Sequence, residues 1–188
     1  LEVPAPPSWA EELAAHNTPG EDAALRRFHE FLDGLADGHG YDNNDLTPGA
    51  TSGLSAHLRF GELSPSYVWA ETVAFAEEHP TAAPDAWAFL RQLVWRDFAW
   101  HLLTEWPTLP EREWRADFAA FPFRRDTADE TAWTRAITGE PLVDAGLREM
   151  FVTGRMHNRV RLAVASYLSK HLLIDWRVGL RWFADTLI

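Results

Sequence analysis

The chain has 188 residues, a formal net charge of −11 and no cysteine, and 46% of its residues are hydrophobic. This length and composition suit a soluble globular domain with a sizeable core, and the lack of cysteine excludes disulfides and cysteine-ligated iron–sulfur clusters within this sequence. No apolar run reaches the about 20 residues that a membrane span requires, and no signal peptide is evident, so a cytoplasmic location is the default expectation.

Helical periodicity runs through almost the whole sequence, and no segment shows the alternation of a strand. Helices are predicted at residues 8–16, 20–38, 52–59, 65–78, 85–105, 129–137, 141–153, 156–173 and 176–187. A loop at 38–48 and an irregular crossing rich in Pro and Trp at 107–123 interrupt them. The sequence therefore predicts an all-α fold without repeats.

Hydroxyl side chains gather in the TSGLS segment at residues 51–55, where a helical pattern begins. One hydroxyl would be enough for an N-cap, yet Thr51, Ser52 and Ser55 supply more, and Gly53 allows a ligand to approach the backbone. A helix N-terminus also attracts anions. On this motif alone, capping of the helix and binding of a diphosphate both stay open.

A second cluster lies in FLRQLVWRDFAW at residues 89–100. The spacing of Phe89, Gln92 and Arg96 predicts one helix face, and Trp95 is expected on the same side. Core packing explains aromatic residues at helical spacing. It explains the amide and the guanidinium poorly, because polar groups buried without partners are costly.

The third cluster opens the apolar segment 153–176, where His157, Asn158, Arg159 and Arg161 crowd the first turns of a predicted helix. We expect this helix to be buried, with its polar end left for a ligand. Asn158 and Arg161 are spaced to face one side, which suits an anionic or heteroaromatic ligand. The alternative is a capped helix whose arginines form surface ion pairs.

Together these segments resemble the photolyase/cryptochrome family in its α-helical FAD-binding domain, closest to bacterial cyclobutane pyrimidine dimer photolyases. The resemblance covers most of 41–188 and is specific because several motifs occur in order. They are TSGLS at 51–55, FGELSP at 60–65, WRDF at 95–98, TGEPLVDAGLREM at 138–150, MHNRVR at 156–161 and LLIDWRVG at 172–179.

The resemblance implies light-dependent repair of pyrimidine dimers in DNA by electron transfer from reduced FAD, the reaction of a deoxyribodipyrimidine photo-lyase. The residues it implies at the cofactor are Tyr41, Thr51, Ser52, Gly53, Leu54, Ser55, Phe89, Arg96, Asn158, Arg161 and Phe183. Those implied at a flipped-out dimer and its flanking DNA are Gln92, Trp95, Arg96, Asn158 and Arg159. Trp176 is implied as an electron-relay residue, and Asn158 as a catalytic residue.

Some positions depart from the family pattern. Gln92 stands where pyrimidine-dimer photolyases commonly have Glu. (6-4) photolyases and animal cryptochromes also have Gln at this position. Leu162 stands where animal-type (6-4) enzymes have a catalytic histidine. Phe123 stands at the outer relay position, where the family has a tryptophan. Either the relay is interrupted there, or Trp114 or Trp133 takes over this role. A (6-4) photolyase, a cryptochrome-type blue-light receptor without repair, and a non-enzymatic helical module therefore remain as alternatives.

The resemblance also predicts the domain organisation. Residues 1–40 are expected to be a linker and leading helices, and 41–188 the FAD-binding domain, incomplete at its C-terminus. The sequence ends at 184–188, where the family continues into an acidic segment and an Asn-rich turn at the flavin. The α/β antenna domain, with any antenna chromophore, is expected to be missing.

The negative charge is unusual for a DNA-binding protein, because phosphate contacts need cations. Acidic residues concentrate at 11–45, 71–85 and 126–140, however, while Arg155, His157, Arg159 and Arg161 are expected to form a local positive pole. We therefore expect modest, salt-sensitive affinity for damaged DNA. The protein is also expected to be a monomer. The other histidines lack metal-ligand spacing, so no metal is expected.

Overall fold

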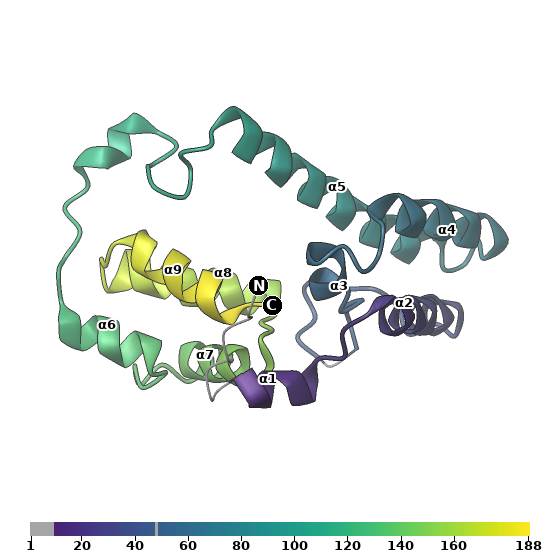
Figure 1. The fold of residues 1–188 in the computed structure, drawn as a ribbon, viewed down its shortest axis with the longest axis horizontal. Coiled ribbons are helices and arrows are strands. Elements are labelled where there is room, and N and C mark those ends of the chain that lie inside the picture. The colour runs from purple at the N-terminus through teal and green to yellow at the C-terminus, as the bar shows by residue number, and fades with distance from the viewer. Residues whose placement is uncertain (1–9, 48) are drawn as a thin grey trace, which may run out of the picture. The chain divides into compact units, whose positions relative to one another are not determined.

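A computed structural model describes residues 10–47 and 49–188 of the chain (Figure 1). The regular structure of the described residues is helical, and the only β pairing among them is an isolated parallel bridge between Arg124 and Ile174. The predicted all-α fold is confirmed. The chain divides into two compact units, Pro19–Pro107 and a second made of Leu1–Thr18 with Thr108–Ile188. The predicted boundary at residue 40 remains a prediction.

The unit Pro19–Pro107 contains helices α2 (Glu21–Ala36), α3 (Ser55–Arg59), α4 (Pro65–Glu78) and α5 (Ala83–Glu105). Its core forms where one face of α2 meets α4 and the first half of α5, with Phe28, Phe31, Val68, Phe89 and Leu90 fully or almost fully buried. The second half of α5 carries exposed aromatic side chains. This half lacks the buried positions of the first.

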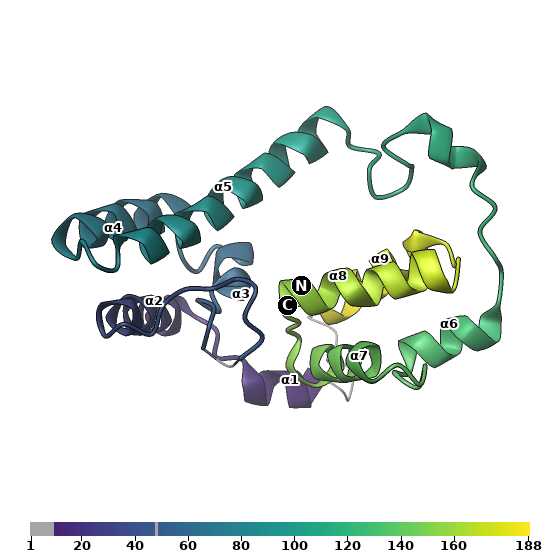
Figure 2. The same cartoon turned by 180° about the vertical axis from the view of Figure 1, so that it is seen from behind.

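The other unit contains α1 (Ala10–His16), a 3₁₀ turn η1 (Ala116–Ala120), α6 (Thr127–Thr134), α7 (Pro141–Thr153), α8 (Asn158–Ser166), a π-helical turn η2 (Tyr167–His171) and α9 (Trp176–Thr186). Figure 2 shows these helices from behind. α7 packs against both α1 and α8, and the core is built around the fully buried Trp133. Asn17, which follows α1, links it to the end of α7, because its amide donates to the Thr153 carbonyl at 2.8 Å.

Helix boundaries agree with prediction where the sequence marks them clearly. α4 and α7 begin and end at the predicted residues, and each has proline in its first turn. The predicted start at residue 8 lies outside the described residues. Asp126 caps α6 by accepting from Ala128 and Asp129, so this helix begins two residues earlier than predicted and ends at Thr134.

The predicted helix 156–173 is wrong at both ends. His157 is the N-cap, so α8 begins at Asn158, and regular α geometry ends at Ser166. The chain continues as the π turn η2 and then reaches Leu173, which adopts a left-handed conformation with φ 56°. Such a conformation is costly for leucine and cannot continue a helix.

Candidate functional site

The TSGLS segment does not cap a helix. α3 begins only at Ser55, its N-cap position is Leu54, and no side chain caps it. The capping interpretation of Thr51 and Ser52 is therefore wrong, as is the predicted start of the helix at residue 52. The Ser52 hydroxyl instead accepts a long hydrogen bond from the Leu54 N–H at 3.5 Å. The hydroxyl groups of this segment are consequently not committed to the helix.

Gly53 takes the left-handed conformation that glycine favours, with φ +69°. Arg27 of α2 packs against the side of Gly53 where a side chain would project. Its Nε would lie 3.1 Å from a Cβ at residue 53. Arg27 donates to the carbonyl oxygens of Ser52 at 2.8 Å and Thr51 at 3.4 Å. The sequence analysis missed Arg27, because nothing in the local pattern of α2 links it to a segment so far along the chain.

Tyr41 packs its ring between two core aromatics of the same unit. The ring centroid lies 5.8 Å from that of Phe31 and 5.9 Å from that of Phe89. Burial raises the pKa of the Tyr41 phenol to about 12, partly offset by the charge of Arg91. The phenol therefore stays a neutral hydrogen-bonding group at physiological pH.

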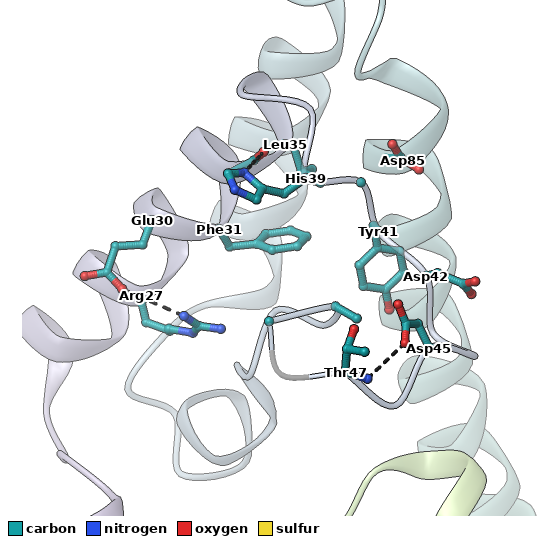
Figure 3. A pocket seen from close by; sticks show the side chains of 14 residues that line it. Arg27, Glu30, Phe31, Leu35, His39, Tyr41, Asp42, Asp45, Thr47 and Asp85 are labelled. Atoms are coloured by element: carbon teal, nitrogen blue, oxygen red, sulfur yellow. Dashed lines mark hydrogen bonds and ion pairs between the residues drawn. The ribbon is translucent and has the colours of Figure 1, made fainter.

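Tyr41 also lines a cavity of about 770 Å³ formed by α2, the loop after it and the start of α5 (Figure 3). Acidic side chains dominate the charged groups of its wall, which are Arg27, Glu30, His39, Asp42, Asp45 and Asp85. Such a wall repels a diphosphate. Tyr41 is the only predicted cofactor contact among the described residues of the wall.

The cluster on α5 divides between two environments. Phe89 is only 3% exposed and belongs to the core, whereas Trp95 is 64% exposed. The expectation that both aromatics share one face is wrong, because an offset of six residues places their side chains about 120° apart around an α-helix. Gln92 is half-buried, and so is Arg96, which has a partner. Its Nη2 donates to the Leu58 carbonyl at 3.2 Å, linking α5 to α3.

Leu54, another predicted cofactor residue, is buried in the same core as Phe89. Its side chain therefore faces the protein interior. Any contact of Leu54 with a ligand would have to come from its backbone.

The start of α8 combines a free amide with an incompletely bonded guanidinium. Asn158 is exposed, and its side chain makes no hydrogen bond to another described residue. The Nη2 atom of Arg161 donates to the Met156 carbonyl at 3.3 Å, but its Nε is buried without a partner among the described residues. Burial lowers the pKa of Arg161. A buried guanidinium N–H without a hydrogen-bond partner is costly, so a bound acceptor at this position would stabilise Arg161.

The expected burial of this helix holds only for one side. Val160 and Val164 are buried against α7, while Leu162 is exposed. The expected positive pole at this end of the helix remains a prediction. His157 accepts the Arg159 N–H through Nδ1 at 3.2 Å and so caps α8. Arg155 donates to Asn17 at 3.0 Å.

Trp176, the predicted relay residue, is half-buried at the start of α9. The Arg177 guanidinium lies 4.5 Å from the centroid of its ring. Glu113 binds Arg177 at 2.9 Å. A hydrogen bond from its own backbone, followed by those from Arg177 and Trp176, lowers the pKa of Glu113. The crossing segment that carries Trp114 is therefore fastened to the predicted relay residue.

The candidates for the outer relay position differ sharply in exposure. Trp133 is fully buried, and its Nε1 donates to the Val164 carbonyl at 3.2 Å. Its ring lies 5.9 Å from that of the half-buried Phe183. Trp114, by contrast, is 57% exposed. Only Trp114 among these residues is open to a reductant in solution.

Within the described residues, no group of His, Asp or Glu is arranged to hold a metal ion. The same part of the chain contains no helix long and apolar enough to cross a membrane.

Comparison with known proteins agrees with these features. The family described as the FAD binding domain of DNA photolyase matches residues 89–188. A deoxyribodipyrimidine photo-lyase of Agrobacterium fabrum is 45% identical over 99% of this chain, which spans 38% of that protein. The chain thus corresponds to less than two-fifths of the curated relative's length.

Solved structures give the same result. A bacterial class III photolyase from Agrobacterium tumefaciens matches with a TM-score of 0.85 and 46% identity, over 98% of this chain and 38% of its own. A cryptochrome of Synechocystis sp. PCC6803 matches with a TM-score of 0.83 and 31% identity, over 100% of this chain and 41% of its own. The fold is thus that of a helical flavin-binding domain. The chain belongs to the photolyase/cryptochrome family, within its FAD-binding domain.

Proposed function

We propose that this chain is the catalytic, FAD-binding part of a deoxyribodipyrimidine photo-lyase, which repairs cyclobutane pyrimidine dimers in DNA with light. The observation that carries the proposal is the start of α8, where the amide of Asn158 is exposed and the buried Nε of Arg161 has no hydrogen-bond partner among the described residues. Identity of 45% with a photo-lyase along nearly the whole chain supports it.

The available groups fit FAD. The hydroxyls of Thr51 and Ser55 suit the diphosphate and ribityl region, because neither of them caps α3. Arg161 would meet the flavin or an acidic group beside it, which would satisfy its buried Nε. When bound, FAD supplies the light-driven electron, and the protein supplies placement and electrostatics.

Residues of α5 would receive the lesion. Trp95 is exposed and can stack against a flipped-out base, and the half-buried Gln92 can hydrogen-bond its edge. Arg159, which is exposed, would contact flanking phosphate. We further propose that the protein acts as a cytoplasmic monomer and that its DNA affinity is modest and salt-sensitive.

Trp176 would carry electrons toward the cofactor, and Trp114 would serve as the outer member in place of Phe123. The exposure of Trp114 and the contact of its neighbour Glu113 with Trp176 favour it over the buried Trp133.

A cryptochrome-type receptor is the second candidate. The amide of Gln92 can hydrogen-bond a base but cannot donate a proton as a carboxylic acid can, and a cryptochrome shares the fold with 31% identity. A (6-4) photolyase is less favoured, because Leu162 cannot replace a catalytic histidine.

One experiment separates these functions. The intact protein is mixed with DNA containing both cyclobutane dimers and (6-4) lesions, and its visible absorption and the content of each lesion are followed under blue light in reducing conditions. Flavin bands with loss of cyclobutane dimers are expected. Flavin bands that respond to light while both lesions persist would favour the cryptochrome, and loss of (6-4) lesions alone would favour the (6-4) photolyase.

A further inference from the structure

Arg27 spans a long distance in sequence to hold the backbone of the TSGLS segment. It projects from α2, and its Nε and Nη2 donate to the carbonyl oxygens of Ser52 and Thr51 at 2.8 and 3.4 Å. The remaining Nη1 lies 3.8 Å from Glu30. Two nitrogens of the guanidinium are thus committed to the protein backbone, and the third lies near a carboxylate.

The fit against Gly53 is close. A Cβ at this residue would lie 3.1 Å from Nε and 3.3 Å from Nη2 of Arg27, and the φ of +69° already disfavours any other residue. The guanidinium therefore covers one side of the Gly53 backbone. With the carbonyls of Thr51 and Ser52 turned toward Arg27, their side-chain hydroxyls are not used to cap α3.

We propose that Arg27 is a positioning residue that sets the conformation of segment 51–55 before the cofactor arrives. This inference rests on the proposed function, in which that segment holds the diphosphate of FAD. Arg27 acts through the backbone and does not itself bind the phosphates. A preformed segment binds more tightly, because less conformational entropy is lost on binding.

The bidentate geometry sets the choice of variants. A lysine keeps the charge of Arg27 but cannot span two carbonyl groups with a planar fork. Arg27→Lys therefore separates positioning from charge, and Arg27→Ala removes both. Arg26→Ala is the matched control, since Arg26 is the exposed neighbour on the same helix.

The test measures the Kd for FAD of the intact protein after removal of its cofactor, together with amide hydrogen exchange at residues 51–55 of the FAD-free protein. Arg27→Ala and Arg27→Lys should each raise the Kd about tenfold, which corresponds to about 1.4 kcal/mol. Both should also accelerate exchange at 51–55. Arg26→Ala should change neither quantity.

Wild-type affinity and exchange in Arg27→Ala would overturn the proposal. Full rescue by Arg27→Lys would also overturn it, because charge alone would then suffice. If the wild type itself failed to bind FAD, the proposed function would fall. Exchange at 51–55 would still decide whether Arg27 holds the segment.

Discussion

Asp144 accepts both the backbone N–H and the hydroxyl of Thr138, at 2.8 and 2.7 Å. It also accepts the Gly139 N–H at 3.0 Å and is only 7% exposed. Burial alone would raise the pKa of Asp144, but these hydrogen bonds, with the charge of Arg148, hold it below its ordinary value. The aspartate of the TGEPLVDAGLREM motif therefore has a structural role, which is to hold the turn before α7. No contact of Asp144 with a ligand is proposed.

Asp144→Asn should destabilise the protein by about 2 kcal/mol, since an amide has one acceptor oxygen for donors that now share two. Urea unfolding at pH 7 would measure the change. Because the pKa is lower in the folded protein, the stabilisation is present above the ordinary carboxyl pKa and disappears as the pH falls through the folded value. The exposed Asp185→Asn is the control. Equal stability of the two variants would contradict this role.

Glu62 links two elements of the unit Pro19–Pro107. It accepts from the buried His57 at 2.6 Å and from the Gly20 N–H at 2.8 Å, just before α2. The hydrogen bond from His57, followed by that from Gly20, lowers the pKa of Glu62. The interaction therefore stabilises the folded state above the ordinary carboxyl pKa of about 4.3 and is lost as the pH falls through the folded value.

Glu62→Gln should accordingly lower the Tm at pH 7, and its effect should shrink as the pH falls from the ordinary carboxyl pKa through the lower folded value, because the wild type is then protonated as well. Thermal unfolding across this pH range gives the measurement, with the exposed Glu71→Gln for comparison. An effect that does not depend on pH would show that the carboxylate charge is unimportant here.

Local signals predicted the helices well where they were strong. Pro65 and Pro141 fix helix starts through their φ angle, and the predicted bounds of α4 and α7 are confirmed. Hydroxyl residues misled the prediction at residues 51–55, because the same side chains suit a cap and a ligand. The π turn at Tyr167–His171 has no local signature of this kind and was missed.

For the candidate site, the sequence revealed residues whose chemistry stands out against an apolar background, such as Asn158 and Arg161. It could not reveal partners brought together by the fold. Arg27 and Glu62 look like ordinary surface charges in the sequence, and only tertiary contacts give them roles. Phe89 was predicted to contact the cofactor but lies in the core, because helical spacing alone does not distinguish a core position from a ligand contact.

Gly146 allows α7 and α8 to approach each other. A Cβ on Gly146 would collide with Val160 Cγ1 and lie 3.3 Å from Val164 Cγ2. Gly146→Ala should gain up to about 1 kcal/mol of helix propensity, yet overpacking of about 1–3 kcal/mol should outweigh it, since valine has few rotamers to escape into. A net fall in unfolding free energy is expected.

Gly34→Ala in α2 is the matched control, because its nearest neighbour would be 3.8 Å away, an ordinary contact. It should stabilise the protein by up to about 1 kcal/mol. Adding Val160→Ala to Gly146→Ala should cost less than the sum of the single changes. Additive effects would argue against a direct collision.

Asn158 offers a test of ligand contact that is separate from folding. Its exposed amide makes no hydrogen bond to another described residue, so Asn158→Ala should change the unfolding free energy by less than about 0.5 kcal/mol. If the amide contacts the flavin or the lesion, the same change should lower dimer repair about tenfold or more, as expected for one lost hydrogen bond of about 1.4 kcal/mol. Repair kinetics and urea unfolding of the same sample give both values.

Leu162→Ala, which shortens another exposed side chain of α8, should leave both unchanged. Parallel losses of repair and stability in Asn158→Ala would instead make Asn158 a structural residue.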